Sequence, residues 1–216
     1  MEIYLLRHGS SLANENRLVC GAFDYPLSNK GVEQALFISE HLSKVSFTKI
    51  YTSPLSRAIN TISKLENVVQ PIIVEQLKEL DTGKVSHITL DELWSKNKEF
   101  IRPWLSPKLR YPEGENFHEM TQRIIKWYSM KKFCWSDEDK ILIVGHEGTL
   151  RTIFLYIMNL NLDKYPEFLI ENCDYLKFTF NNSSIIDFKH IKFSDLLSQK
   201  VFKKKADSSS KRNALE

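Results

Sequence analysis

Cysteine is scarce in this sequence of 216 residues, which contains only Cys20, Cys134 and Cys173. The three are far apart and odd in number, and no two of them form a Cys-x-x-Cys pair. A disulfide framework or a zinc knuckle needs cysteines at close and regular spacing. We therefore expect reduced thiols and a cytoplasmic protein.

Long hydrophobic runs are also missing. The most apolar segment, TIFLYIMNLNL, is too short to span a bilayer, which takes about 20 residues. At the N-terminus, apolar residues begin at Ile3 and are soon interrupted by Arg7, so we expect no signal peptide. The sequence therefore predicts no membrane partner.

Two common hydrolase motifs are absent from the sequence. There is no Gly-x-Ser-x-Gly elbow, which argues against a serine hydrolase of that type. There is also no G-x-x-x-x-G-K-[ST] loop, which argues against nucleotide hydrolysis by a P-loop enzyme.

Charge is balanced over most of the chain, with a formal net charge of +3 that gathers in the tail KVFKKKADSSSKRNALE. Lysine and serine dominate this tail, which is typical of a solvated, partly disordered segment. Phe202 is its only aromatic residue, so we expect no nucleic-acid partner. The length favours one domain over residues 1–192, followed by a basic tail over 193–216.

Strand-like and helix-like segments alternate along the domain. The strand-like segments are IYLLR, FTKIYTSP, PIIVEQ and KILIVGH, followed by a hairpin, DYLKFTFNN with SSIIDFKHI. Helical patterns lie between them, and one begins after Ser28 as a predicted N-cap. This alternation predicts an α/β fold, a three-layer α/β/α sandwich around a mainly parallel sheet. Residues 84–115 contain the proline-rich segment RPWLSPKLRYPEGE and are a candidate substrate cap.

Polar residues that suit phosphate chemistry follow several of these segments. Arg7 and His8 end the first strand, Arg57 begins a helix, Glu79 lies in a loop and His146 follows the most apolar strand. Ligands of such sheets bind beyond the carboxyl ends of the strands. Arginine offers a planar fork of donors to phosphate oxygens. A neutral imidazole can attack phosphorus, and a carboxylic acid can protonate the leaving oxygen.

Five segments of the sequence together resemble the histidine phosphatase superfamily, the phosphoglycerate mutase-like proteins. They are LLRHGSSLAN, GAFDYPLSNKGVEQA, YTSPLSRAINT, YPEGENFHEM and ILIVGHEGTLRTI, and they span most of residues 1–190 in the order of the family. The resemblance implies the phosphoglycerate mutase-like fold and a phosphatase that acts through a covalent phosphohistidine. It implies no metal or organic cofactor, and a small phosphate ester as the partner. Nothing in the pattern specifies an oligomeric state.

The resemblance also implies roles for single residues. His8 would be the nucleophile, Glu79 the proton donor, and His146 the second catalytic histidine. The residues that would line the phosphate pocket are Arg7, Asn14, Arg57 and the backbone amide of Glu147.

The sequence departs from the family pattern at three places. Ser10 stands where an acidic residue is common, and Lys84-Val85-Ser86 stands where Trp-Glu-Gly is usual. Glu147 follows the second histidine, where glycine or asparagine is usual, so a carboxylate would alter the charge or specificity of the pocket.

Several alternatives remain open from the residues. Asp81 or Glu115 would replace Glu79 as the acid if the match around Gly83 is misaligned. His8, His146 and Glu79 would suit zinc, although two flanking arginines would repel the cation. A cofactor-dependent phosphomutase would use the same residues, and a phosphate-binding protein with little turnover would keep the pocket alone.

Overall fold

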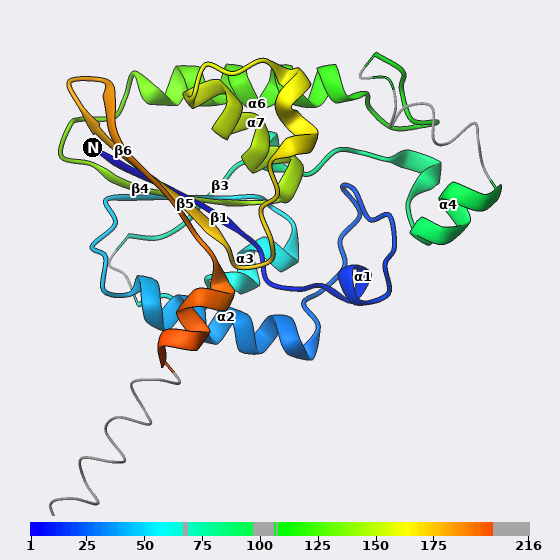
Figure 1. Cartoon of the computed structure of the whole chain (residues 1–216), viewed down its shortest axis with the longest axis horizontal. Coiled ribbons are helices and arrows are strands. Elements are labelled where there is room, and N and C mark those ends of the chain that lie inside the picture. Colours follow the sequence, from blue (N-terminus) through cyan, green and yellow to red (C-terminus); the bar gives the residue numbers. More distant parts are fainter. Residues whose placement is uncertain (67–68, 97–105, 107, 201–216) are drawn as a thin grey trace, which may run out of the picture.

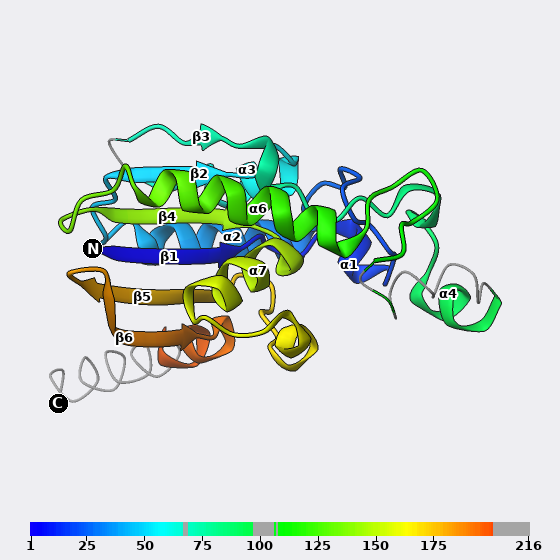
Figure 2. The ribbon, with the colours of Figure 1, turned by 90° about the horizontal axis from the view of Figure 1, so that it is seen from above.

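A six-stranded β-sheet forms the centre of the molecule. The computed structural model describes residues 1–66, 69–96, 106 and 108–200. The strands are β1 (Glu2–Arg7), β2 (Lys49–Thr52), β3 (Ile72–Ile73), β4 (Lys140–Gly145), β5 (Tyr175–Asn181) and β6 (Ser184–Ile191). Their order across the sheet is β3-β2-β4-β1-β5-β6, which Figure 2 shows from above. The first four strands pair in parallel, and the β5–β6 hairpin adds two antiparallel strands beside β1.

The central strands are buried on both faces. Along β1, Ile3 and Leu5 join one hydrophobic cluster, whereas Tyr4 and Leu6 join another. Successive side chains of a strand point to opposite faces, so the two clusters lie on opposite sides of the sheet. A continuous apolar run is therefore required of β1 and β4, and helices must cover both faces.

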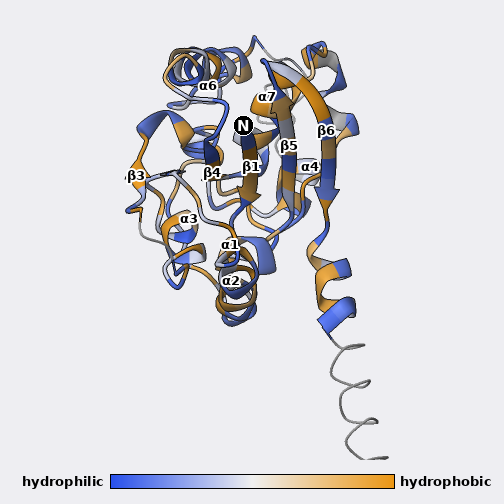
Figure 3. Cartoon of the chain, turned by 90° about the vertical axis from the view of Figure 1, so that its left-hand side faces the viewer, coloured by the Kyte–Doolittle hydropathy of each residue, from blue (hydrophilic) through white to orange (hydrophobic). Residues whose placement is uncertain are grey.

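Helices cover the two faces of the sheet, as Figures 1 and 3 show. On one side lie α6 (Phe117–Lys132) and α7 (Glu147–Ile157), and on the other lie α2 (Asn29–Leu42) and α3 (Ser56–Thr61). Met120 of α6 and Leu150 of α7 pack into the cluster of Ile3, whereas Ile38 of α2 packs into that of Tyr4. The predicted three-layer α/β/α sandwich is confirmed.

Local signals place the beginnings of two helices. Ser28 Oγ accepts the backbone N–H of Gly31 at 3.1 Å, which is the predicted N-cap of α2. Asn116 and Glu119 form a reciprocal capping box that begins α6.

The proline that opens the segment PLSRAINTISKLE predicts a helix from that residue on, but helix α3 is shorter. It begins at Ser56 rather than at Pro54 and ends at Thr61. Both carboxylate oxygens of Asp24 accept the backbone N–H of Ser56, at 2.9 and 3.0 Å. The cap thus comes from a residue far away in the sequence, and no local pattern could show it.

The candidate cap region is described in part. It contains the short 3₁₀ helix η2 (Gly83–Val85) and α4 (Leu90–Lys96), and Thr89 Oγ1 accepts the N–H of Glu92 at 3.1 Å. Residues 97–105 and 107 lie outside the described residues. A cap over the site therefore stays a prediction.

The predicted tail begins with ordered structure. Residues 193–200 are helical, and Phe193 and Leu196 are buried in the same cluster as Tyr4. Residues 201–216 lie outside the described residues, so the predicted boundary at 192 is not tested. No helix in the part of the chain that is described is long and apolar enough to cross a membrane.

Candidate active site

The register of two neighbouring strands brings two histidines together. In the parallel pair β1–β4, Arg7 lies opposite Gly145, and the N–H of His8 donates to the carbonyl oxygen of Gly145 at 3.0 Å. The next residue of each strand therefore leaves the sheet at the same edge. The ring centroids of His8 and His146 are 5.0 Å apart, and both side chains are buried.

The hydrogen bond of His8 fixes its tautomer. Its Nδ1 lies 2.7 Å from the carbonyl oxygen of Gly9. A carbonyl oxygen only accepts, so Nδ1 carries the proton and Nε2 keeps the lone pair. This is the arrangement that a nucleophilic imidazole needs.

His146 is held from both sides. Arg57 Nε donates to His146 Nδ1 at 3.2 Å, which leaves the ring proton on Nε2. That Nε2–H donates to Ser53 Oγ at 2.8 Å. Ser53 follows β2, the strand on the other side of β4, and its own N–H donates to the carbonyl oxygen of Val144.

Both imidazoles are held in the neutral form. Burial lowers the pKa of His8 well below its usual value of 6.5, and the charges of Arg57 and Arg7 lower it further. Burial also lowers the pKa of His146 well below that value, again with Arg57 as the largest charge effect. A neutral His8 is ready to attack, and a neutral His146 is ready to donate one hydrogen bond.

Arg57 joins the site to the loop before α2. The residue is only 2% exposed. Its Nη1 donates to the carbonyl oxygen of Phe23 at 2.7 Å, and its Nη2 donates to that of Gly21 at 2.8 Å. Nη1 also forms a long ion pair with Oδ1 of Asp24, at 3.9 Å. A buried guanidinium with so distant a carboxylate partner suits an anionic ligand.

Arg7 is the second guanidinium near the histidines, and its charge lowers the pKa of both. Its Nη1 donates to the carbonyl oxygen of Ile170 and lies 3.2 Å from Oε2 of Glu147. Its Nε is buried and has no hydrogen-bond partner within the described residues. An unpaired buried donor costs about 1–3 kcal/mol, which a phosphate oxygen would offset.

Glu79 is positioned at the beginning of α7. Its Oε2 accepts the N–H of Gly148 at 2.9 Å, and its Oε1 accepts the N–H of Leu80 at 2.8 Å. Arg123 of α6 donates to the backbone carbonyl of Glu79 at 3.1 Å. The carboxyl group thus lies at the first turn of the helix whose N-cap is His146.

The two alternative acids are engaged elsewhere. Asp81 Oδ1 accepts the N–H of Gly83 at 2.9 Å within a turn. Glu115 forms an ion pair with Arg123 and accepts the N–H of Asp81 at 3.0 Å. Of the three carboxylates, Glu79 is the one that contacts α7.

Asn14 takes part in the cap at the beginning of a short helix. Its Oδ1 accepts from the backbone N–H and the hydroxyl of Ser11, which caps the short helix α1 (Leu12–Glu15). Asn172 Nδ2 lies 3.3 Å from the same Oδ1 and 2.9 Å from the carbonyl oxygen of His8. A phosphate-binding role for Asn14 stays a prediction.

Sequence reasoning missed several residues of the site. Ser53 lies within a quoted motif, YTSPLSRA, but only the contact with His146 reveals it. Asn172 follows no motif. Tyr165 and Arg151 pack together, with Arg151 Cζ 5.1 Å from the centroid of the tyrosine ring. Burial and then the charge of Glu79 raise the pKa of Tyr165 well above 10, so its hydroxyl stays protonated.

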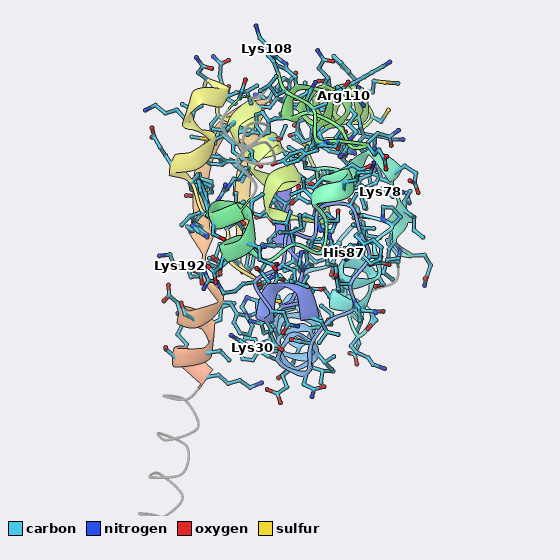
Figure 4. All side chains as sticks on the ribbon, turned by 90° about the vertical axis from the view of Figure 1, so that its right-hand side faces the viewer. Lys30, Lys78, His87, Lys108, Arg110 and Lys192 are labelled. Atoms are coloured by element: carbon cyan, nitrogen blue, oxygen red, sulfur yellow. The ribbon has the colours of Figure 1, made fainter. Side chains whose placement is uncertain are left out.

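A polar cavity of about 710 Å³ opens beside Glu79. Among the described side chains that line it, only Ala22 and Phe23 are apolar. The wall is of mixed charge, with the cationic side chains of Lys78, Arg110 and Arg123 and the carboxylates of Glu75, Glu79, Asp81, Glu113 and Glu115. Figure 4 shows basic side chains spread around this end of the molecule: Lys30, Lys78, His87, Lys108, Arg110 and Lys192.

His8, His146 and Glu79 are poorly arranged to bind a zinc ion. Across the described ranges, no three His, Cys, Asp or Glu side chains are grouped so as to hold a metal ion. One ring nitrogen of His146 accepts from a guanidinium and the other contacts Ser53, so neither is directed at a shared cation.

Comparisons with known proteins agree with this geometry. Residues 3–188 match the profile of the histidine phosphatase superfamily (branch 1). The chain is 26% identical to phosphoserine phosphatase 1 of Hydrogenobacter thermophilus over 81% of this chain and 84% of that protein. It is also 26% identical to a protein of Cronobacter sakazakii named "Probable phosphoglycerate mutase GpmB", over 85% and 86%. The α-ribazole phosphatase of Shigella flexneri has the same fold, with a TM-score of 0.77, 23% identity and coverage of 88% and 96%.

Proposed function

Because this chain belongs to the histidine phosphatase superfamily, we propose that it hydrolyses phosphate monoesters of small polar metabolites through a phosphohistidine on His8. The observation that carries the proposal is the pair of buried imidazoles, 5.0 Å apart, with the guanidinium groups of Arg7 and Arg57 close enough for their charges to lower the pKa of both rings. Two fixed positive charges in a buried pocket favour a phosphate dianion and stabilise the charge of its transition state.

In the first step, His8 Nε2 attacks phosphorus and the ester P–O bond breaks. Arg7 and Arg57 hold the phosphoryl oxygens, and the Nε2–H of His146 turns from Ser53 to one of them. The carboxyl group of Glu79 gives its proton to the leaving oxygen, so that an alcohol departs rather than an alkoxide. The product of this step is phosphohistidine with an ionised Glu79.

In the second step, water attacks the phosphohistidine. Glu79 takes a proton from this water, the P–N bond breaks, and the lone pair returns to His8 Nε2. Orthophosphate leaves, and Glu79 is protonated again. In a mutase, a bound alcohol would take the place of this water.

Two features favour hydrolysis over phosphate transfer. The cofactor-dependent mutases of the family carry a longer insertion after the second arginine, and their segment around the acid differs from LKELDTGKV. The wall of the cavity beside Glu79 is hydrophilic, which suits water and a polar leaving group. An enzyme is also favoured over a simple phosphate-binding protein, because Nε2 of His8 is free of a proton and Glu79 lies at the first turn of the helix that follows His146.

The nucleophile is tested by His8→Ala with 4-nitrophenyl phosphate and an alkyl phosphate. We expect a loss of at least ~10³-fold in kcat, because the covalent step is removed. Acid quench of the wild-type enzyme with ³²P-labelled substrate should trap an acid-labile, alkali-stable label that the variant lacks.

His118→Ala is the matched control, since His118 is an exposed residue of α6. Adding an alcohol as acceptor separates hydrolysis from transfer, because a phosphatase releases one orthophosphate for each leaving alcohol. Full activity of His8→Ala would contradict the covalent mechanism.

A further inference from the structure

We propose that Glu147 is a specificity-determining residue that selects phosphate esters of amine-bearing alcohols, such as an O-phosphorylated amino acid. The inference rests on the proposed phosphatase function and names its substrate class. It starts from the side chain that departs from the family pattern, directly after His146.

Glu147 lies between two guanidinium groups. Its Oε2 is 3.2 Å from Nη1 of Arg7, and its Oε1 accepts a hydrogen bond from Nη2 of Arg151. The side chain of Glu147 is 28% exposed, so solvent reaches this carboxylate despite its two arginine partners.

Arg151 holds this carboxylate in place. It is 9% exposed, it lies one turn further along α7, and its guanidinium packs over the ring of Tyr165. Because Oε1 of Glu147 is bound to this buried partner, the carboxylate keeps its position whatever Arg7 does.

Arg7 is the partner that changes when phosphate binds. Its donors are needed by the phosphoryl oxygens, and its unpaired Nε shows that it is not saturated by the protein. Once Arg7 turns to phosphate, Oε2 of Glu147 loses its cation and faces a nearby dianion. An ammonium group of the substrate would restore the pairing and offset this repulsion.

Glu147 lies beside the residue that holds the proton donor in place. Glu79, the proton donor for the leaving oxygen, is bound to the amide of Gly148, the residue next to Glu147. Tyr165 lies near both carboxylates. Burial is the largest cause of its raised pKa, and the charges of Glu79 and Glu147 raise that pKa further. A leaving group that takes its proton from Glu79 would depart on the side of Gly148, where an ammonium group would pair with Oε2 of Glu147.

The test compares two esters that differ in one group. O-Phosphoserine and 3-phosphoglycerate share a three-carbon skeleton and a carboxylate, but one carries an ammonium where the other carries a hydroxyl. We expect wild-type kcat/KM to favour O-phosphoserine by about tenfold or more, the value of one charge-assisted contact. Glu147→Gln should bring the ratio close to one. Phosphoethanolamine and ethylene glycol phosphate form a second pair without the carboxylate and should behave alike.

The ratio is insensitive to general damage of the phosphate pocket, since both esters need the same pocket. Glu167→Gln is the control, because it removes an exposed carboxylate that pairs with Lys164. A wild-type ratio near or below one, or a ratio unchanged in Glu147→Gln, would overturn the inference. Hydrolysis of 4-nitrophenyl phosphate without either ester would also overturn it and leave the phosphatase standing, whereas inactivity toward every ester would overturn both.

Discussion

At the scale of single residues, the site depends on two histidines that are buried without charge. Folding lowers the pKa of His8 and of His146, mainly by burial and next by Arg57. In the unfolded chain each imidazole takes up a proton near pH 6.5, whereas in the folded protein it does not. The folded state therefore binds fewer protons, and its free energy of unfolding rises with pH and falls on acidification below pH 6.5.

We expect each histidine to contribute up to about 1.4 kcal/mol of lost stability per pH unit below 6.5. Urea unfolding between pH 7.5 and 5.0 measures this slope, and His8→Asn with His146→Asn should make it shallower. The carboxyl group of Asp139 does not add to the slope in this pH range. Its pKa is lowered to about 2, so the stability that it contributes is lost only below about pH 4. Equal slopes in both proteins would show that the imidazoles are not held neutral.

At the scale of elements, the first turn of α7 positions the carboxyl group of Glu79. A Cβ on Gly148 would come within 2.3 Å of Oε1 of Glu79 and 2.8 Å of the hydroxyl of Tyr165. Glycine is therefore required for the carboxylate to approach the helix, although alanine would favour a helix by up to about 1 kcal/mol.

Gly148→Ala is expected to lower kcat by about 10²-fold, because Glu79 is displaced while the fold remains. The loss should be larger for an alkyl phosphate than for 4-nitrophenyl phosphate, whose leaving group needs no proton, and Glu79→Gln should show the same dependence. Circular dichroism melts would confirm that the variant is folded. A loss that is equal for both esters would place the acid elsewhere.

At the scale of the whole molecule, exposed basic side chains lie around the end where the parallel strands finish. Lys30, Lys108 and Lys192 come from separate segments of the chain and surround the mixed-charge wall of the cavity (Figure 4). The field of such side chains raises the rate of encounter with anions and is screened over about 8–10 Å at moderate salt.

We expect kcat/KM for a phosphate dianion to fall several-fold between about 20 and 200 mM salt, whereas kcat stays constant. Lys108→Glu with Lys192→Glu should weaken this dependence, and both residues are exposed on that face. The same salt dependence in the double variant would assign the effect to the pocket arginines alone.

The elements and the core of the site could be predicted from the sequence because their signals are local. Apolar runs marked β1 and β4, Ser28 marked the beginning of α2, and the residues after the strands marked His8 and His146. The start of α3 was missed because its cap, Asp24, is a distant residue. Ser53 and Tyr165 were missed because their roles depend on contacts across the sheet and across α7.

The sequence by itself determined which residues could do phosphate chemistry and that they would follow strands and begin helices. Only the tertiary structure decided which ring nitrogen of each histidine carries the proton, that Glu79 rather than Asp81 or Glu115 meets α7, and that Glu147 lies between Arg7 and Arg151. The reason is physical. Alternation and capping act between neighbours in the chain, whereas hydrogen bonds and burial in the site join residues that only the register of the sheet brings together.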